Sequence, residues 1–142
     1  MTAQDTRIRR VSCNDFRIRE LHARVFPNDV EPDWPDAQWW TAERGSQAIA
    51  FAGIQQSKRW RDAGYLVRAG VVPSARGQGL QRRLIRVREG YARRMGWRWI
   101  VTATLHNPAS ANSLIASGFR LYEPAHPWLA DGALYWRKRV AP

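Results

Sequence analysis

The stretch from Val71 to Leu80, with the sequence VVPSARGQGL, has the residue types of an anion-binding turn. An apolar strand is expected to end here, Gly77 and Gly79 permit a sharp turn, and an amphipathic helix is expected to start at once. Outward-facing backbone N–H groups and the positive end of a helix dipole together hold phosphate groups. The stretch therefore predicts a site for an anion such as a pyrophosphate.

Two common phosphate-binding motifs do not fit this turn. The P-loop of nucleotide hydrolases requires Gly-Lys-Ser/Thr, but Leu80 follows Gly79. The dinucleotide fingerprint requires a third glycine where Arg82 stands. The pattern R-x-x-G-x-G/A is satisfied by Arg76 and Gly79 but not at its last position, which is Gln81. On this motif alone, a glycine-containing turn without a ligand remains an open alternative.

The stretch resembles the coenzyme A loop of the GNAT N-acetyltransferase superfamily, here V-V-P-S-A-R-G-Q-G-L-Q-R-R-L-I. A second feature of that superfamily follows at the expected distance, with Asn107, Ser110 and Gly118-Phe119 in the pattern N-x-x-S-x7-G-F. The order of the expected elements also matches, so the resemblance covers nearly the whole chain. It implies transfer of an acetyl group from acetyl-CoA, or a close acyl-CoA, to an amine.

The resemblance implies a role for each matching position. Backbone groups of Val71 and Val72 would pair with the pantetheine arm as though it were an added strand. One N–H group near Val72 would polarise the thioester carbonyl as an oxyanion hole. Asn107 and Ser110 would contact the pantetheine near the thioester. The pyrophosphate would be held by the N–H groups of Arg76, Gly77, Gln78, Gly79, Leu80, Gln81 and Arg82.

The two side chains that commonly transfer protons in this superfamily are missing from their positions. Amine attack needs a neutral amine, and a lysine-like amine has a pKa of about 10.4, so a proton acceptor is required. The segment 65–70 lacks the usual glutamate, and Leu114 stands where many relatives have a tyrosine. Positioning with oxyanion stabilisation alone is an open alternative. The candidate side chains are Ser113 and Tyr122 for the acid and Glu43 and Asp62 for the base.

Tryptophans near the proline-rich segment 28–36 are candidates for an acceptor pocket. In GNAT folds this region usually shapes the acceptor site, so the resemblance suggests that Trp34 and Trp39 line it. Trp128, between Pro127 and Leu129, would close the other side. Packing in the core is the alternative for Trp39.

The net charge of +11 comes almost entirely from arginine. Such a charge attracts polyanions at low salt, although arginine-rich composition explains it without any partner. Arg82 and Arg83 are expected near the 3′-phosphate of the cofactor, whereas Arg86, Arg88, Arg93 and Arg94 are expected on a solvated helix face. A nucleic acid or its bound protein as acceptor, and a coenzyme A-binding module without activity, remain alternative functions.

The spacing of apolar residues and the positions of turn residues predict a mixed α/β fold. The resemblance implies that this is the GNAT fold. We expect a mostly antiparallel mixed sheet of six to seven strands with helices on both faces. A capping box at Ser12 and Asp15 should start the first helix, whose apolar stripe is Phe16, Ile18, Leu21 and Val25. The second helix should present Leu80, Leu84, Val87, Tyr91 and Met95 on one face, and the third should span 107–117. The expected strands are 7–11, 39–42, 47–55, 65–72, 97–105, 119–122 and 133–140.

The length of 142 residues predicts one domain, residues 1–142. No apolar run is long enough to span a bilayer, the N-terminus lacks a signal sequence, and Cys13 is the only cysteine, so we expect a cytoplasmic protein. The three histidines have no metal-ligand spacing, and no metal is expected. Homodimer formation is left open.

Overall fold

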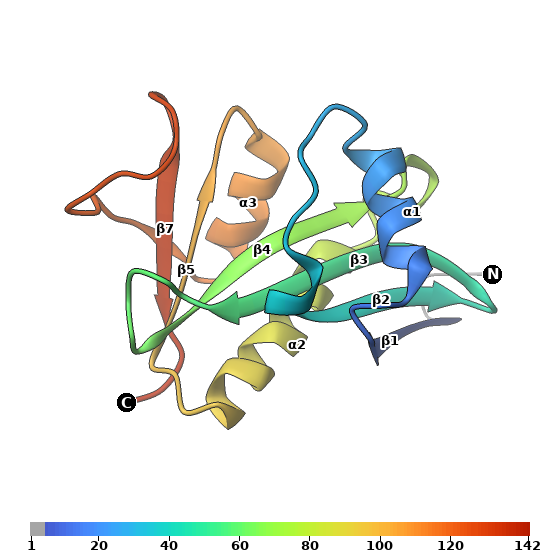
Figure 1. The fold of residues 1–142 in the computed structure, drawn as a ribbon, viewed down its shortest axis with the longest axis horizontal. Helices are drawn as coiled ribbons and strands as arrows, with labels where there is room; N and C mark the ends of the chain where they lie inside the picture. The colour runs from blue at the N-terminus through green and yellow to red at the C-terminus, as the bar shows by residue number, and fades with distance from the viewer. Residues whose placement is uncertain (1–4) are drawn as a thin grey trace. The chain divides into compact units, whose positions relative to one another are not determined.

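The computed structural model describes residues 5–142 and shows the order of elements that the sequence predicts (Figure 1). The strands are β1 Thr6–Val11, β2 Gln38–Arg44, β3 Gln47–Gln56, β4 Ala63–Val71, β5 Trp99–Thr104, β6 Arg120–Leu121 and β7 Leu134–Arg139. The α-helices are α1 Phe16–Val25, α2 Leu80–Arg94 and α3 Pro108–Ala116. Two 3-10 turns, η2 Trp34–Asp36 and η3 Pro73–Ala75, complete the described elements.

The strands form one mixed sheet in the order β1-β2-β3-β4-β5-β7-β6. The pairs β1/β2, β2/β3, β5/β7 and β6/β7 are antiparallel, and β4/β5 is parallel. The parallel pairing covers only three residue pairs, from Ala63↔Trp99 to Tyr65↔Val101. This arrangement confirms the mixed, mostly antiparallel sheet.

The chain divides into two compact units that share β4 and α2. The first unit comprises the chain up to residue 55 together with residues 67–84, and the second comprises residues 56–66 and 85–142. We describe each unit by itself.

The core of the first unit is an aromatic cluster between α1 and the strands β2 and β3. Trp39 and Phe51 are fully buried, with ring centroids 6.1 Å apart. The buried His22 of α1 packs edge-on to Trp34 at 5.6 Å and to Phe51 at 6.2 Å. Its Nε2 is buried and has no hydrogen-bond partner in the described part of the chain. Burial therefore favours a neutral imidazole and lowers the pKa of His22.

The start of α1 differs from the prediction. Asp15, not Ser12, is the N-cap, because its carboxylate accepts the N–H of Arg17 at 3.0 Å. Ser12 instead accepts the N–H of Asn14 in the preceding turn. The predicted capping box is therefore wrong. Phe16 lies two residues before Ile18, about 200° around the helix at 3.6 residues per turn, and its exposure of 64% shows that it does not belong to the buried stripe.

In the second unit, α2 buries more polar groups than its apolar spacing predicts. Arg88 and Glu89 are buried alongside Ile85 and Ala92, so the expectation that Arg88 lies on a solvated face is wrong. Burial lowers the pKa of Arg88 to about 9. Met95 was expected on the buried face, but it follows the last helical residue and is 51% exposed.

Gly96 ends α2. Its φ is +79°, its N–H donates to Arg93 O, and the N–H of Trp97 donates to Ala92 O. This pair of bonds is a Schellman motif, which needs the left-handed conformation that glycine adopts without strain.

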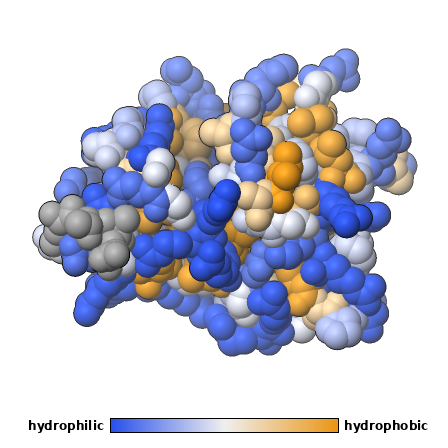
Figure 2. All heavy atoms as spheres, turned by 180° about the vertical axis from the view of Figure 1, so that it is seen from behind, coloured by the Kyte–Doolittle hydropathy of each residue, from blue (hydrophilic) through white to orange (hydrophobic). Residues whose placement is uncertain are grey.

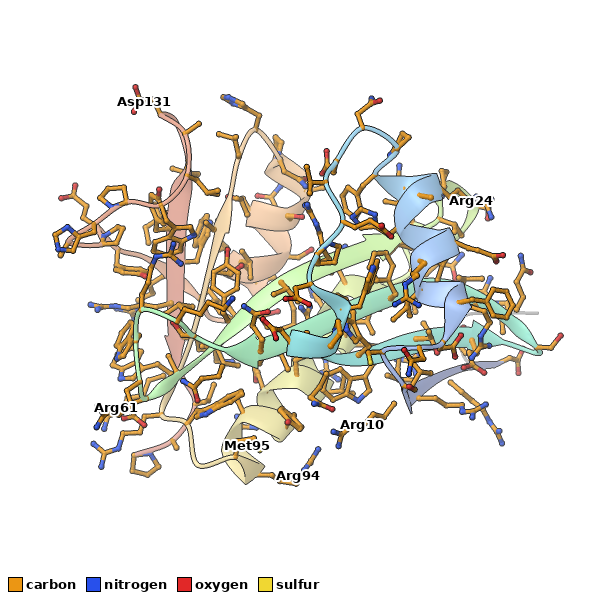
Figure 3. All side chains as sticks on the ribbon, in the orientation of Figure 1. Arg10, Arg24, Arg61, Arg94, Met95 and Asp131 are labelled. Atoms are coloured by element: carbon orange, nitrogen blue, oxygen red, sulfur yellow. The ribbon has the colours of Figure 1, made fainter. Side chains whose placement is uncertain are left out.

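The surface is rich in arginine. Figure 3 shows Arg24, Arg61 and Arg94 pointing away from the ribbon, and all three are exposed. On the face drawn in Figure 2, hydrophilic side chains surround smaller hydrophobic areas. No helix within residues 5–142 is both long and apolar enough to cross a membrane.

Candidate functional site

The turn from β4 to α2 has the geometry of an anion cradle. After Val72, η3 is closed by the bonds Ala75 N–H to Val72 O at 2.9 Å and Arg76 N–H to Pro73 O at 3.3 Å. Gly77 and Gly79 then take φ values of +77° and +78°, a left-handed conformation that strains other residues. A Cβ at either glycine would meet no atom within 4 Å, so the space beside the turn is open.

The start of α2 offers unpaired backbone donors to that open space. The first backbone bond of the helix runs from Arg83 N–H to Gly79 O at 3.1 Å. Leu80, Gln81 and Arg82 therefore have no carbonyl partner for their N–H groups inside the helix. These groups carry the partial positive charge of the helix N-terminus, which favours a phosphate.

Three backbone groups of the loop that were expected to contact the cofactor are bonded within the protein in this structure. The N–H of Arg76 closes η3 and is not directed outward as a donor. Its guanidinium Nε donates to the carbonyl of Val71 at 3.1 Å, the group expected to pair with a pantetheine arm. The N–H of Val72 donates to Ile49 O at 3.0 Å and so belongs to the sheet.

A backbone irregularity in β4 lies just before the loop. A Cβ on Gly53 would come 2.8 Å from Val67, and a Cβ on Gly70 would come 2.9 Å from Phe51. Gly53 and Phe51 share a face of β3, so Val67 and Gly70 face the same side although they are three positions apart. Such a break in alternation indicates a β-bulge, which leaves one residue outside the ladder and redirects its backbone groups.

A hydrogen-bond network that the sequence did not predict fixes the far side of the loop. The guanidinium of Arg44 donates to Gln78 Oε1 and also to Thr6 Oγ1, at 3.2 Å. Arg83 donates to the backbone carbonyl of Thr6 at 2.9 Å. Arg83 was expected near a 3′-phosphate, but here it links α2 to β1. The antiparallel register Thr6↔Arg44 brings these groups together, and no local motif encodes it.

The start of α3 in the second unit is built by Asn107. Its Oδ1 accepts the N–H of Ser110 at 3.1 Å, which makes it the N-cap. Asn107 is exposed and Ser110 half-buried. Leu114 is 5% exposed, so the position of the family's usual tyrosine is part of the core.

The two candidate acids lie in the second unit. Tyr122 is half-buried, with Trp60 at 6.2 Å and the Arg137 guanidinium carbon 5.0 Å from its ring centre. Burial raises the pKa of Tyr122, the direction that keeps a proton donor protonated. Ser113 is half-buried on α3, and its carbonyl accepts the N–H of Ser117.

The two candidate bases take part in ion pairs. Glu43 is 4% exposed, contacts Arg9 and Arg17 at 3.2 Å each, and accepts the hydroxyl of Thr41 at 2.8 Å. Burial alone would raise its pKa, but Thr41 and the two arginines together hold the pKa of Glu43 below its ordinary value. Asp62 lies 3.6 Å from the guanidinium of Arg98. A carboxylate with a lowered pKa is a weak base, so Glu43 is better explained as a structural ion pair.

The three candidate tryptophans differ in burial. Trp34 and Trp39 are 5% and 0% exposed, and the indole N–H of Trp39 donates to Trp34 O at 2.9 Å. Their burial corrects the expectation that they line an acceptor pocket, since both rings belong to the core of the first unit. Trp128 is half-buried in the second unit, where its ring meets Tyr135 at 4.6 Å and its indole N–H lies 3.4 Å from Tyr65 Oη.

Comparison with known proteins identifies the class. Residues 6–119 match the Acetyltransferase (GNAT) family, so the chain belongs to that family. This confirms the family, and with it the acetyltransferase class, that the glycine loop and the asparagine motif predict. A comparison with curated protein sequences gives no match.

Solved structures share the fold at low sequence identity. An IAA acetyltransferase from Bacillus cereus superposes with a TM-score of 0.78 at 12% identity, covering 94% of this chain and 99% of the other. NAA60 from Arabidopsis thaliana in complex with acetyl-CoA gives 0.77 at 17%, covering 94% and 98%. The ribosomal-protein-S18-alanine N-acetyltransferase from Escherichia coli gives 0.74 at 18%, covering 96% and 95%.

Proposed function

We propose that this protein transfers an acetyl group from acetyl-CoA to a primary amine. The observation that carries the proposal is the open cradle formed by Gly77, Gly79 and the free N–H groups at the start of α2. When bound, acetyl-CoA supplies the acetyl group as an activated thioester.

The loop residues fit the pyrophosphate of that donor. The N–H groups of Leu80, Gln81 and Arg82 are the free donors of the helix, and Gly77 and Gly79 leave room beside them. The hydrogen bond from Arg44 of β2 to Gln78 Oε1 fixes the loop to the sheet. The exposed guanidinium of Arg82 is suited to a further phosphate group.

Asn107 and Ser110 are proposed to bind the pantetheine arm, on the strength of the family motif. The Asn107 carbonyl oxygen caps α3, so the carboxamide N–H₂ is the part of the side chain that would meet a ligand carbonyl. The proposed oxyanion donor is a backbone N–H near Val72 and the β4 bulge, and it is not that of Val72 itself, which donates to Ile49 O at 3.0 Å.

Tyr122 is the better of the two candidate acids. Its raised pKa keeps the phenol protonated when the thiolate leaves. Of the candidate tryptophans Trp34, Trp39 and Trp128, Trp128 is the one that is partly exposed. We propose that it contacts the acceptor.

An amine acceptor agrees with the name of one similar structure, and an acetyl-CoA donor agrees with that of another. The Escherichia coli protein is named as an alanine N-acetyltransferase of ribosomal protein S18, and the Arabidopsis protein is in complex with acetyl-CoA. Both likenesses lie below 20% identity, so they support the chemistry and do not name the acceptor of this chain.

Calorimetry with acetyl-CoA and S-acetylpantetheine tests the donor site. We expect acetyl-CoA to bind and S-acetylpantetheine, which lacks the pyrophosphate, to bind at least about tenfold more weakly, since each charge-assisted bond is worth roughly 1.5–3 kcal/mol. No binding of acetyl-CoA at millimolar concentration would overturn the proposal.

Radiolabelled acetyl-CoA then tests transfer to a panel of polyamines, lysine peptides and peptides with free N-termini. Label on any of these amines supports the proposed activity. Binding without transfer to any amine would identify a coenzyme A-binding module that has lost its chemistry.

A further inference from the structure

One face of the sheet in the second unit is lined by alternating aromatic and arginine side chains. The register of β5 and β7 pairs Trp99 with Arg139 and Val101 with Arg137, which places these side chains on the same face. Tyr122 continues β6, and its N–H donates to Tyr135 O. We call the surface made by Arg59, Trp60, Trp99, Tyr122, Trp128 and Arg137 the aromatic–arginine face.

The rings and guanidinium groups of this face stack on one another. Trp60 and Trp99 lie 5.3 Å apart with an interplanar angle of 32°. The Arg137 guanidinium carbon lies 5.2 Å from the Trp99 ring and 5.0 Å from the Tyr122 ring. On the neighbouring loop, Arg59 lies 4.9 Å from the ring of Trp128. The four aromatic residues are each half-buried, and the Arg139 guanidinium carbon also lies 5.8 Å from the Trp99 ring.

The opposite side of the same strands is covered by helices. Lys138 of β7 points to that side, where its ammonium contacts Glu89 of α2 at 2.8 Å and the carbonyl of Ser117, after α3, at 2.7 Å. The aromatic–arginine face is instead bordered by the loops 57–62 and 122–133, which supply Trp60 and Trp128. A helix therefore packs on one side of this part of the sheet, and the other side retains exposed cations.

The charge of this face is not neutralised within residues 5–142. Arg59 and Arg137 are exposed, and neither makes an ion pair with a carboxylate in the described part of the chain. Arg61, Arg120 and Arg139 are exposed in the same loops and strands. Flat rings beside unpaired guanidinium groups match a ligand that carries both π faces and phosphates.

We propose that the aromatic–arginine face binds a short segment of single-stranded nucleic acid. Bases would stack against the accessible parts of Trp60, Trp99 and Tyr122, and phosphates would pair with Arg59 and Arg137. A duplex hides its base faces, and an acidic peptide has no bases to stack, so neither uses the rings. The face shares Tyr122 and Trp128 with the proposed catalytic site, and the binding of single-stranded nucleic acid does not depend on acetyl-CoA.

Fluorescence anisotropy with a labelled 12-nucleotide single strand at 50 mM salt tests the proposal. Base stacking and phosphate pairing respond to different variants. We expect Trp60→Ala to weaken binding at least fivefold without changing its salt dependence, and Trp60→Phe to retain most of the affinity. Arg137→Gln should weaken binding several-fold and reduce the slope of log K against log salt by about 0.7, the value for one phosphate contact on a single strand.

Arg24→Gln is the matched control, because it removes the same charge from an exposed position on α1. It should change affinity less than twofold. Equal losses for Arg24→Gln and Arg137→Gln would overturn the proposal, as would equal affinity for a duplex of the same length or displacement by poly-glutamate at equal charge concentration. Acetyl-CoA calorimetry on the same variants separates this result from the donor site, since Trp60→Ala and Arg137→Gln should bind acetyl-CoA as the wild type does.

Discussion

Replacing Gly79 with alanine should separate the anion cradle from general stability. Gly79 and Gly96 lie at opposite ends of α2 with φ values of +78° and +79°, and an added Cβ meets nothing within 4 Å at either place. Holding an L-residue in the left-handed region costs about 1–2 kcal/mol. Gly79→Ala and Gly96→Ala should therefore lower the free energy of unfolding by similar amounts, which urea denaturation measures.

Their effects on acetyl-CoA binding should differ. In Gly79→Ala, a change of backbone conformation that relieves the left-handed strain would rotate the N–H groups of residue 79 and Leu80 away from the open space. Losing one charge-assisted hydrogen bond costs roughly 1.5–3 kcal/mol, which corresponds to about a tenfold to hundredfold loss of affinity. Calorimetry should show this loss for Gly79→Ala and wild-type affinity for Gly96→Ala. Equal affinities of the two variants would refute the cradle.

Three further outcomes follow from the contacts described. Asn107→Ala should destabilise the protein by about 1 kcal/mol through loss of the α3 cap, which thermal unfolding measures. Asn107→Asp should keep the cap and the stability but lower kcat/KM, which steady-state kinetics measures. Glu43→Gln should cost about 1 kcal/mol, because the two arginines that lose their partner, Arg9 and Arg17, remain 59% and 26% exposed; since the folded pKa of Glu43 lies below the unfolded one, this stabilisation is present above the unfolded pKa and is lost as pH falls through the folded pKa. A fall in activity with unchanged stability would instead make Glu43 the base. Stability should also decline as pH falls below about 6.5, the usual pKa of histidine, because burial keeps His22 neutral in the fold while the unfolded chain takes up the proton; urea titrations of His22→Leu should lack this dependence.

Periodicity and turn residues predicted the order of elements well, because those signals are local. Gly96 and Gly118 follow helices, and both adopt positive φ. The capping box at Ser12 failed because two cap-forming residues stand three positions apart, and only the turn before α1 decides which one caps the helix. The second residue, Asp15, also holds Arg17 at 2.8 Å.

The candidate site was predictable only where it is made of backbone. The loop 71–82 could be located from glycine spacing, whereas the Arg44–Gln78 contact joins residues 34 positions apart and depends on strand register. The burial of Arg88 could not be predicted either, since arginine on a helix is ordinarily solvated and only the surrounding tertiary packing overrides this. Trp34 and Trp39 were assigned to a pocket on proximity to a proline-rich loop, which does not distinguish a lining ring from a packed one.

The bond from Arg83 to the carbonyl of Thr6 spans 77 positions of the chain. The contact between the loop and β1 cannot form until Arg83 has been synthesised, whereas β1 can already pair with β2 through the register Thr6↔Arg44 to Val11↔Trp39. Affinity for acetyl-CoA would then depend on the completed contact between the loop and β1. Free acetyl-CoA would in turn stabilise the folded chain by mass action.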